Sequence, residues 1–311
     1  MTRRIAVISD VHGNYTALQS VLEDAWRQGV SEHWVLGDVF MPGTGGADIF
    51  DLLHSVNVSA WVRGNWDDGL VDAVRGNINV DDPTDVYCAR LAMYVHQTIG
   101  DEGVAKIASW PLTLTKQVEG LSVQLSHNLP QQNYGGGLMP SAPQDSFADL
   151  FVGSDADVAI VGHTHCPLMR NDRGRLIINP GAAGISGPTK ALRTASQVLA
   201  AGEPAAGAWL DRGVQYVVLA FGEQGIEQID FRSVWFDVAD ELRRAYRLGL
   251  PYTDLYREQL ETGVTHTHDV GLLDQSNRRN GYRIDVREFI AARRGEPALT
   301  GRQRQPSPMS W

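Results

Sequence analysis

The start of the chain alternates short apolar runs with segments of helical periodicity. Residues 5–8, 33–36 and 58–62 are apolar runs of the length of buried strands, too short for helices. Residues 16–28 repeat apolar side chains with the spacing of an amphipathic helix, and residues 47–54 form a shorter helical segment. Strands that alternate with helices in this order are typical of an α/β protein with parallel strands.

The next part of the chain combines a long helical region with a hairpin. Residues 81–110 are mostly helical in pattern, with Asp101 as the cap of a short second helix. Residues 112–118 and 121–125 then alternate apolar and polar positions on either side of a Glu-Gly pair. This alternation predicts two antiparallel strands joined by a tight turn.

Further strands follow in the second half of the chain. Residues 158–161 and 175–178 are predicted as short buried strands, and residues 214–219 and 226–231 as a second hairpin. The remaining segments are predicted as loop at 131–143, helix at 146–152, and an Ala-rich insertion at 189–209 with a helix near 191–200.

Beyond residue 234 the pattern changes to surface helices rich in Arg and Glu, predicted at 238–248 and 252–260. From residue 295 onward Pro, Gln, Arg and Ser dominate, a composition typical of disorder. The predicted organisation is a main domain at 1–234, a helical extension at 235–294 and a disordered tail at 295–311.

The composition narrows the class of protein. Hydrophobic residues make up 43% of the chain and the formal net charge is -10, which argues against a general nucleic-acid binder with a basic face. The two cysteines, Cys88 and Cys166, form no framework, and this favours a reducing compartment. No apolar run is long enough for a signal-peptide core or a membrane span. We therefore expect a cytoplasmic protein.

The residues that carry chemistry gather at the predicted strand ends, where open α/β sheets collect their functional groups. The central pair is His163 and His165, which follow the strand at 158–161. Imidazole is the commonest neutral metal ligand in proteins. In chain order, the strand-end groups are Asp10, His12, Asp38, Asn65, His127, His163 and His165.

This set of side chains predicts a metal centre. Carboxylate, amide and imidazole donors without a thiolate suit Mn, Fe or Zn. The set is too large for one tetrahedral ion, and it suits two ions that share a bridging carboxylate. Two ions roughly 3.5–4 Å apart can clamp both the attacking and the leaving oxygen of a phosphoryl displacement. Taken singly, Asp10 or Asn65 is better explained as a helix cap.

The ordered motifs resemble those of the calcineurin-like metallophosphoesterases over about residues 5–231. The resemblance rests on Asp10-Val11-His12, Gly37-Asp38, Gly64-Asn65, His127 and Gly162-His163-Thr164-His165. Asn179-Pro180-Gly181 and Trp110-Pro111-Leu112 also resemble the family's bacterial YfcE-type branch. The resemblance implies a two-sheet αββα sandwich flanked by helices, here followed by the C-terminal helical extension.

The resemblance also implies a role for each motif residue. One ion would take Asp10, His12 and His165, the other would take Asn65, His127 and His163, and Asp38 would bridge them. Asp38, Asn65 and His127 would be catalytic, and Asn65, Trp66 and Gly181 would contact the substrate. The implied ions are Mn, Fe or Zn, with Mn and Fe favoured. The implied reaction is hydrolysis of a phosphodiester or phosphoanhydride by metal-activated hydroxide.

Trp66 departs from the family's pattern, because many members carry a His there that assists the leaving group. An indole N–H only donates a hydrogen bond and cannot act as an acid near neutral pH. General acid help is typically worth roughly 10²–10⁴-fold, so we expect a substrate with a good leaving group. The segment 64–68 also resembles a branch that hydrolyses diadenosine tetraphosphate, which favours a small nucleotide-like substrate.

Other functions stay open at this point. Some family members, such as the metallophosphoesterase-like subunit of the retromer coat, keep the fold and act as protein scaffolds. The complete ligand set argues against that role. A phosphoprotein phosphatase is a third alternative, against which Trp66 weighs. A homo-oligomer is also compatible with the sequence. The C-terminal extension is expected either to cover the active-site cleft or to form a contact between two subunits.

Several polar residues near these motifs are predicted to be supporting groups. Asp67 and Asp68 are expected to cap or support, and Arg63 to contact either phosphate or solvent. The stretch His266-Thr267-His268-Asp269 mimics a metal motif, but no predicted strand precedes it. We therefore do not expect it to bind metal.

Overall fold

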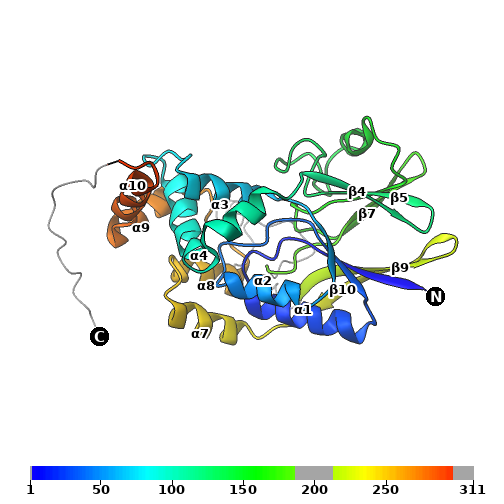
Figure 1. Cartoon of the computed structure of the whole chain (residues 1–311), viewed down its shortest axis with the longest axis horizontal. Coiled ribbons are helices and arrows are strands. Elements are labelled where there is room, and N and C mark those ends of the chain that lie inside the picture. Colours follow the sequence, from blue (N-terminus) through cyan, green and yellow to red (C-terminus); the bar gives the residue numbers. More distant parts are fainter. Residues whose placement is uncertain (1, 186–212, 297–311) are drawn as a thin grey trace.

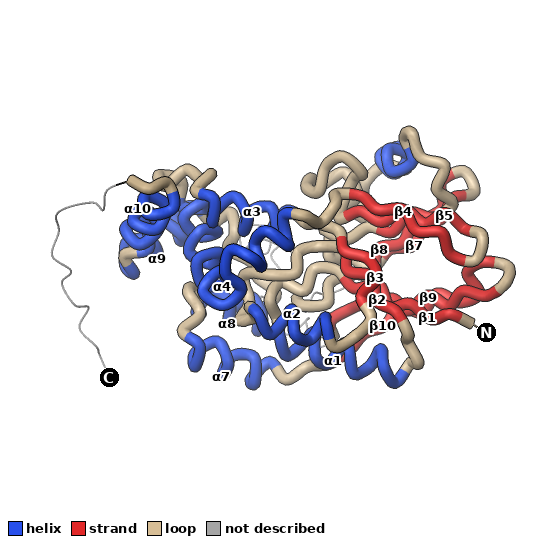
Figure 2. Tube along the Cα trace, viewed as in Figure 1, coloured by secondary structure: helices blue, strands red, loops and turns tan. Residues whose placement is uncertain are grey.

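The computed structural model describes residues 2–185 and 213–296, and in it two sheets face each other with helices packed outside them (Figures 1 and 2). The predicted α/β two-sheet architecture is confirmed. The predicted insertion at 189–209 and its helix lie outside the described residues, as does the tail beyond residue 296.

The first sheet consists of β1 (Arg3–Ile8), β2 (Glu32–Val35), β3 (Val58–Trp61), β9 (Val214–Gly222) and β10 (Gly225–Val234). Its strand order is β10-β9-β1-β2-β3. The first three strands run parallel, and β9 returns antiparallel to β1 and pairs with β10 as the predicted hairpin. The parallel strands therefore end at one edge of the sheet.

The second sheet consists of β4 (Thr113–Val118), β5 (Leu121–Ser126), β6 (Val158–Ile160), β7 (Leu168–Asp172) and β8 (Arg175–Asn179). Its order is β4-β5-β6-β8-β7, with β5, β6 and β8 parallel. Val118 pairs with Leu121, so a two-residue turn joins β4 and β5. Both turn residues have positive φ, 46° at Glu119 and 79° at Gly120, as a type I′ turn requires.

The helices are α1 (Tyr15–Arg27), α2 (Ala47–His54), α3 (Asn65–Arg75), α4 (Pro83–Ala108), α5 (Gln144–Ala148), α7 (Val238–Leu248), α8 (Thr253–Thr262), α9 (Val270–Asn280) and α10 (Tyr282–Arg293). A 3₁₀ turn, η1, spans Asp149–Phe151. The backbone of α4 breaks at Gly100, with φ of 62°, so the predicted division into two helices at Asp101 is confirmed.

The sequence pattern misses α3, β7, α9 and α10. Helix α3 begins inside the polar stretch that we interpret as a turn, and Gly69 interrupts its apolar spacing. Strand β7 lies at the sheet edge and is only partly buried, so it carries no apolar run. Helices α9 and α10 each bury only a few residues, so packing with neighbouring helices determines them more than periodicity does.

The apolar core has one layer between the two sheets, a second between the first sheet and the helices, and a third between the second sheet and the α5–η1 segment. Ile5, Val7 and Trp34 of the first sheet face Leu125 and Ile160 of the second, and all five are almost fully buried. Alternate residues of the same strands point the other way. The central strands are therefore buried on both faces, which fixes the positions of their carboxyl ends.

The C-terminal extension packs on the main domain through the buried carboxylate of Glu241 on α7. This carboxylate accepts hydrogen bonds from the backbone N and Oγ1 of Thr16, at 3.1 and 2.7 Å, and from Thr44 Oγ1 at 2.7 Å. The hydroxyl of Tyr256 on α8 donates to it at 3.0 Å. Glu241 thus joins α7 and α8 to the start of α1 and to the loop before α2. The domain boundary at residue 234 stays a prediction.

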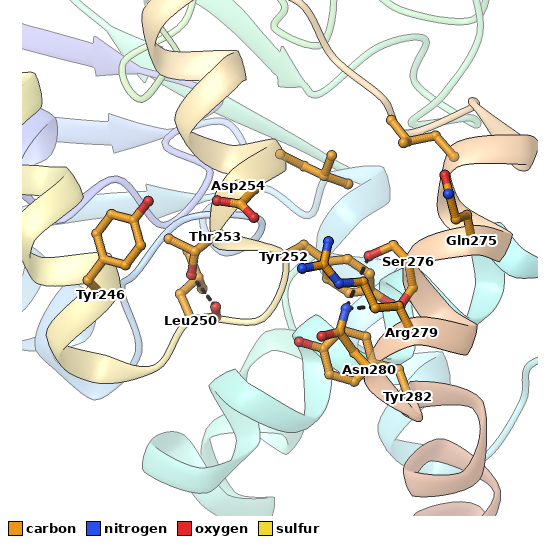
Figure 3. Close-up of a pocket in the computed structure, with 12 residues that line it drawn as sticks. Tyr246, Leu250, Tyr252, Thr253, Asp254, Gln275, Ser276, Arg279, Asn280 and Tyr282 are labelled. Atoms are coloured by element: carbon orange, nitrogen blue, oxygen red, sulfur yellow. Dashed lines mark hydrogen bonds between the residues drawn. The ribbon is translucent and has the colours of Figure 1, made fainter. Parts of the chain in front are cut away.

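The helices of the extension enclose a hollow of about 420 Å³. In Figure 3, Tyr246, Thr253 and Asp254 line one side of it, and Gln275, Ser276 and Arg279 of α9 line the other. Its lining contains none of the predicted strand-end ligands. The hollow is therefore a feature of the extension alone.

Glu241→Ala is expected to lower the free energy of unfolding by about 3 kcal/mol, because four donors, two buried and two partly buried, lose their shared acceptor. Urea denaturation followed by circular dichroism measures this change. Glu261→Ala, at an exposed position of α8, is the matched control and is expected to change little. Equal stability of the two variants would contradict the role given to Glu241.

Candidate metal centre

The seven predicted strand-end residues converge at one edge of the molecule, between the carboxyl ends of the two sheets. Asp10 and His12 follow β1, Asp38 follows β2, and Asn65 opens α3 after β3. From the second sheet, His127 follows β5, and the pair His163 and His165 follows β6. The parallel order within each sheet brings these strand ends together.

The side chains of Asp10, His12, Asp38 and His165 form the first of two groups whose potential ligand atoms all lie within 4.8 Å of one another. The Nε2 atoms of His12 and His165 are 3.1 Å apart, and Asp10 Oδ1 lies 3.1 Å from His165 Nε2. Asp38 Oδ2 lies 3.8 Å from His12 Nε2. The short distances between these donor atoms make the first group a candidate metal site.

Asp38, His127 and His163 form the second group. Asp38 Oδ2 is 3.3 Å from His127 Nε2, and Asn65 Oδ1 is 3.2 Å from the same nitrogen. The rings of His127 and His163 are 5.2 Å apart between centroids. Asp38 is the residue common to both groups.

Backbone carbonyls fix the tautomers of two histidines. His12 Nδ1 donates to the carbonyl of Met41 at 2.8 Å, and His127 Nδ1 donates to the carbonyl of Leu36 at 2.6 Å. A carbonyl only accepts, so each Nδ1 carries a proton. Each Nε2 therefore points into the cluster, and its lone pair binds a metal when the imidazole is neutral.

The buried oxygen Asp10 Oδ1 tests whether the donors fit a metal ion. It accepts no hydrogen bond from the described residues, although it is shielded from solvent. Three imidazole Nε2 atoms, of His12, His127 and His165, lie within 3.9 Å of it. An unpaired buried carboxylate oxygen facing nitrogen donors is costly without a cation. The donor set fits Mn, Fe or Zn.

The pKa values within the cluster follow from burial and from the two carboxylates. Burial acts to lower the pKa of His127, but Asp38 and Asp10 outweigh it and raise that pKa to about 10. Burial, with the neighbouring His165, lowers the pKa of His12 to about 4. Burial alone would raise the pKa of Asp10, but three imidazoles hold it well below its ordinary value.

The backbone at these residues is strained. Asp10, His12, Asp38, His163 and His165 all have φ between 51° and 67°, in the left-handed region. Asp and His are enriched among the non-glycine residues found there, but the conformation remains uncommon. Such residues cluster at functional sites, where the surrounding structure imposes the conformation.

The carboxylate of Asp67 binds the backbone of the loop that carries Asp38. Its carboxylate accepts hydrogen bonds from the amides of Asp38, Val39 and Gly64 at 2.8, 3.1 and 2.9 Å. Burial and the adjacent Asp38 raise the pKa of Asp67 to about 7. Asp67 therefore caps α3 and holds the loop that carries Asp38, so its predicted supporting role is confirmed.

Arg63 and Asp68 pair with each other instead of facing the cluster. Arg63 Nε lies 2.6 Å from Asp68 Oδ1, and Arg63 Nη1 donates to the Ala108 carbonyl at 2.7 Å. Asp68 also accepts a hydrogen bond from Asn133 at 2.7 Å. Two nitrogens of the Arg63 guanidinium are thus paired with protein groups, and its side chain stays partly exposed to solvent.

The structure does not bring Gly181 into contact with the cluster. Its amide donates to Asn179 Oδ1 at 2.9 Å, and the residue is buried. Gly181 also does not line the pocket described below. Its amide thus holds the turn after β8, and a contact with the substrate stays a prediction.

A pocket of about 180 Å³ opens beside the cluster. Trp66 forms part of its wall, and its ring lies edge-on to His12 with centroids 5.7 Å apart. The complete lining is His12, Asp38, Pro42, Asn65, Trp66, His163, His165, Ile185, Gln259, Thr265, Thr267 and His268.

The C-terminal extension contributes to this pocket, which no pattern in the sequence indicates. Gln259 comes from α8, and Thr265, Thr267 and His268 come from the loop between α8 and α9. The motif around His266 is not expected to bind metal, because no predicted strand precedes it, and the sequence gives no sign that it reaches the pocket. Tertiary packing of the extension, and no local pattern, brings it to the pocket.

Comparison with known proteins adds the family and the fold. The model of the calcineurin-like phosphoesterase superfamily domain matches residues 4–199. An uncharacterized protein of Methanocaldococcus jannaschii is 29% identical over 178 residues, which are 57% of this chain and 68% of that protein. Within the described ranges, none of the helices combines the length and apolar content needed to cross a membrane.

Two of the solved structures that resemble this chain share its fold over most of its length. A hypothetical protein from Pyrococcus horikoshii OT3 superposes with a TM-score of 0.62 at 16% identity, covering 84% of this chain and 99% of that one. A metallophosphoesterase from Sphaerobacter thermophilus gives a TM-score of 0.56 at 24% identity, covering 84% and 100%. These similarities show the fold.

Proposed function

The chain belongs to the calcineurin-like phosphoesterase superfamily, and from that premise we propose that it hydrolyses phosphodiester or phosphoanhydride bonds with two bound metal ions. The observation that carries this proposal is the position of Asp38 in both groups of ligand atoms. A single ion would not need two overlapping donor groups. The unpaired buried Asp10 Oδ1 supports the same conclusion.

The proposed roles follow from the donor groups. Asp10, His12 and His165 would hold one ion, Asn65, His127 and His163 the other, and Asp38 both. Two ions held there would supply a hydroxide near neutral pH and would neutralise charge on the phosphoryl oxygens. Asn65 and His127 orient the phosphoryl group beside Asp38, and the indole of Trp66 bounds the space where the rest of the substrate lies.

The proposed substrates are small and nucleotide-like. The pocket is small, and its described lining holds aromatic, hydroxyl and amide side chains but no Lys or Arg. Trp66 offers a flat apolar face to a ring, and it offers no proton to a leaving group. Diadenosine polyphosphates combine such a ring with a phosphate leaving group that is already a stable anion.

The protein loaded with Mn is expected to hydrolyse diadenosine polyphosphates at least tenfold faster, in kcat/KM, than phosphoserine peptides, because the leaving phosphate is already a stable anion whereas the phosphoserine alkoxide must take up a proton. Product release measured by chromatography and by phosphate detection gives both rates. Protein treated with a chelator is the control and is expected to be inactive on both. A preference for the peptide would contradict the proposed substrate class.

A further inference from the structure

The loop between α8 and α9 places one ionisable side chain beside the metal-ligand cluster. Among the described residues that line the pocket, His268 is the one ionisable group outside the predicted ligand set. His268 itself is exposed, so it lies at the mouth of the pocket in contact with solvent. Trp66 lines the same pocket.

Contacts on both sides of His268 hold this loop in place. His266 is nearly buried, with Nε2 3.1 Å from Glu258 Oε2 on α8 and Nδ1 3.7 Å from Asp269 Oδ2. Asp269 caps α9 by accepting from the Leu272 amide at 3.1 Å. The amide of Val270 donates to the His268 carbonyl at 3.1 Å. Since α8 is itself joined to the main domain through Tyr256 and Glu241, His268 has a defined position relative to the cluster.

For phosphodiesters with an alkyl leaving group, the reaction proposed above leaves one chemical requirement unmet. An alkyl phosphodiester expels an alkoxide, which needs a proton as the P–O bond breaks. Trp66 occupies the position after Asn65, and an indole cannot supply that proton. The cluster imidazoles would hold the proposed ions, and their lone pairs would then be committed. The proton must come from another side chain in the pocket or from water.

We propose that His268 is the proton donor to the leaving group, a role that rests on the hydrolase function proposed above. A water oxygen forms the new bond to phosphorus, and the bond from phosphorus to the leaving oxygen breaks. The electron pair of that bond goes to the leaving oxygen, which takes the proton of the His268 imidazolium. The neutral imidazole then regains a proton from solvent, to which it is exposed.

A series of aryl and alkyl phosphodiesters of rising leaving-group pKa tests this role in the Mn-loaded full chain. His268→Gln is expected to lower kcat/KM for alkyl diesters by roughly 10²–10⁴-fold, the usual worth of a general acid. Bis-p-nitrophenyl phosphate needs no proton, so its rate is expected to stay within a few-fold of wild type. Exogenous imidazole is expected to restore part of the alkyl-diester rate in His268→Ala.

Two further measurements separate this role from a structural one. His54→Gln, which changes an exposed histidine outside the pocket, is expected to match wild type on every ester. The metal content of His268→Gln is expected to equal that of wild type. Equal losses on all esters, no loss on any, or a loss of metal in His268→Gln would overturn the role of His268. Absence of wild-type turnover on every ester, with both metals bound, would instead overturn the hydrolase function.

Discussion

Asp38→Asn is expected to lower kcat for bis-p-nitrophenyl phosphate by roughly a thousandfold or more, which corresponds to about 4 kcal/mol of transition-state stabilisation. The reason lies in its position. Asp38 Oδ2 faces His127 at 3.3 Å and His12 at 3.8 Å, so the same carboxylate serves both groups of ligand atoms. An amide is a weaker ligand and removes one negative charge from between the ions.

The same variant is expected to hold fewer metal ions than wild type. Inductively coupled plasma mass spectrometry after dialysis measures the ions bound per chain, and two are expected for wild type. Asp155→Asn is the matched control, because Asp155 is an exposed carboxylate in a loop of the second sheet. A wild-type content of one ion, or full activity in Asp38→Asn, would contradict the bridging role.

Much of the fold was predictable because burial on both faces leaves a strong local pattern. The strands that became β1, β2, β3, β6 and β8 are apolar runs, and both predicted hairpins carry a glycine-bearing turn. Edge strand β7 and helices α9 and α10 bury little surface, so their sequences carry little periodicity. Their positions depend on neighbours that a local reading does not include.

The residues of the candidate site also differ in whether a local sequence pattern or tertiary packing brings them to it. The predicted ligands share one signal, a polar residue directly after a buried strand, and the parallel topology brings them together. Gly181 carries a similar signal, but its amide is used within its own turn. His268 carries no such signal, because it reaches the pocket through the packing of α8, which Glu241 fixes.

The left-handed backbone at five of the ligands was also beyond local prediction. Nothing in the sequence around Asp10 or His163 demands positive φ. The structure shows what imposes it: the amide of His163 donates to Asp10 Oδ2 at 3.1 Å, and the amide of Gly184 donates to the Asp10 carbonyl at 3.0 Å. Contacts between distant segments therefore hold the strained turns.

Metal affinity at the group that contains His127 is expected to rise about tenfold for each pH unit between pH 7 and 9, roughly a hundredfold in all, because an ion must displace one proton from that imidazole. In the metal-free protein, Asp38 and Asp10 overcome the effect of burial and raise the pKa of His127 to about 10. The ring is therefore an imidazolium at pH 7 and cannot bind metal. His12, whose pKa is lowered to about 4, is already neutral and contributes no such dependence.

The same shift sets the sign of a stability change without metal. The pKa of His127 is higher in the folded chain than the usual value of about 6.5 for an unfolded histidine. Protonation of His127 therefore stabilises the metal-free fold fully below about pH 6.5, and this contribution is lost as the pH rises through about 10. Metal-free protein is thus expected to unfold more readily at pH 10 than at pH 7, while metal-loaded protein is not.

Nitrogen-15 NMR of the imidazoles measures the protonation state of His127. Calorimetric titration with Zn²⁺ measures how metal affinity depends on pH. The metal-free spectrum is expected to show His127 as an imidazolium at pH 8 that becomes neutral when Zn²⁺ is added. In Asp38→Asn the pKa of His127 is expected to fall, because one of the two carboxylates that raise it is gone. A neutral His127 at pH 8 in metal-free wild type would contradict the charge pairing on which the pH dependence rests, and the steep rise in affinity would then need another source.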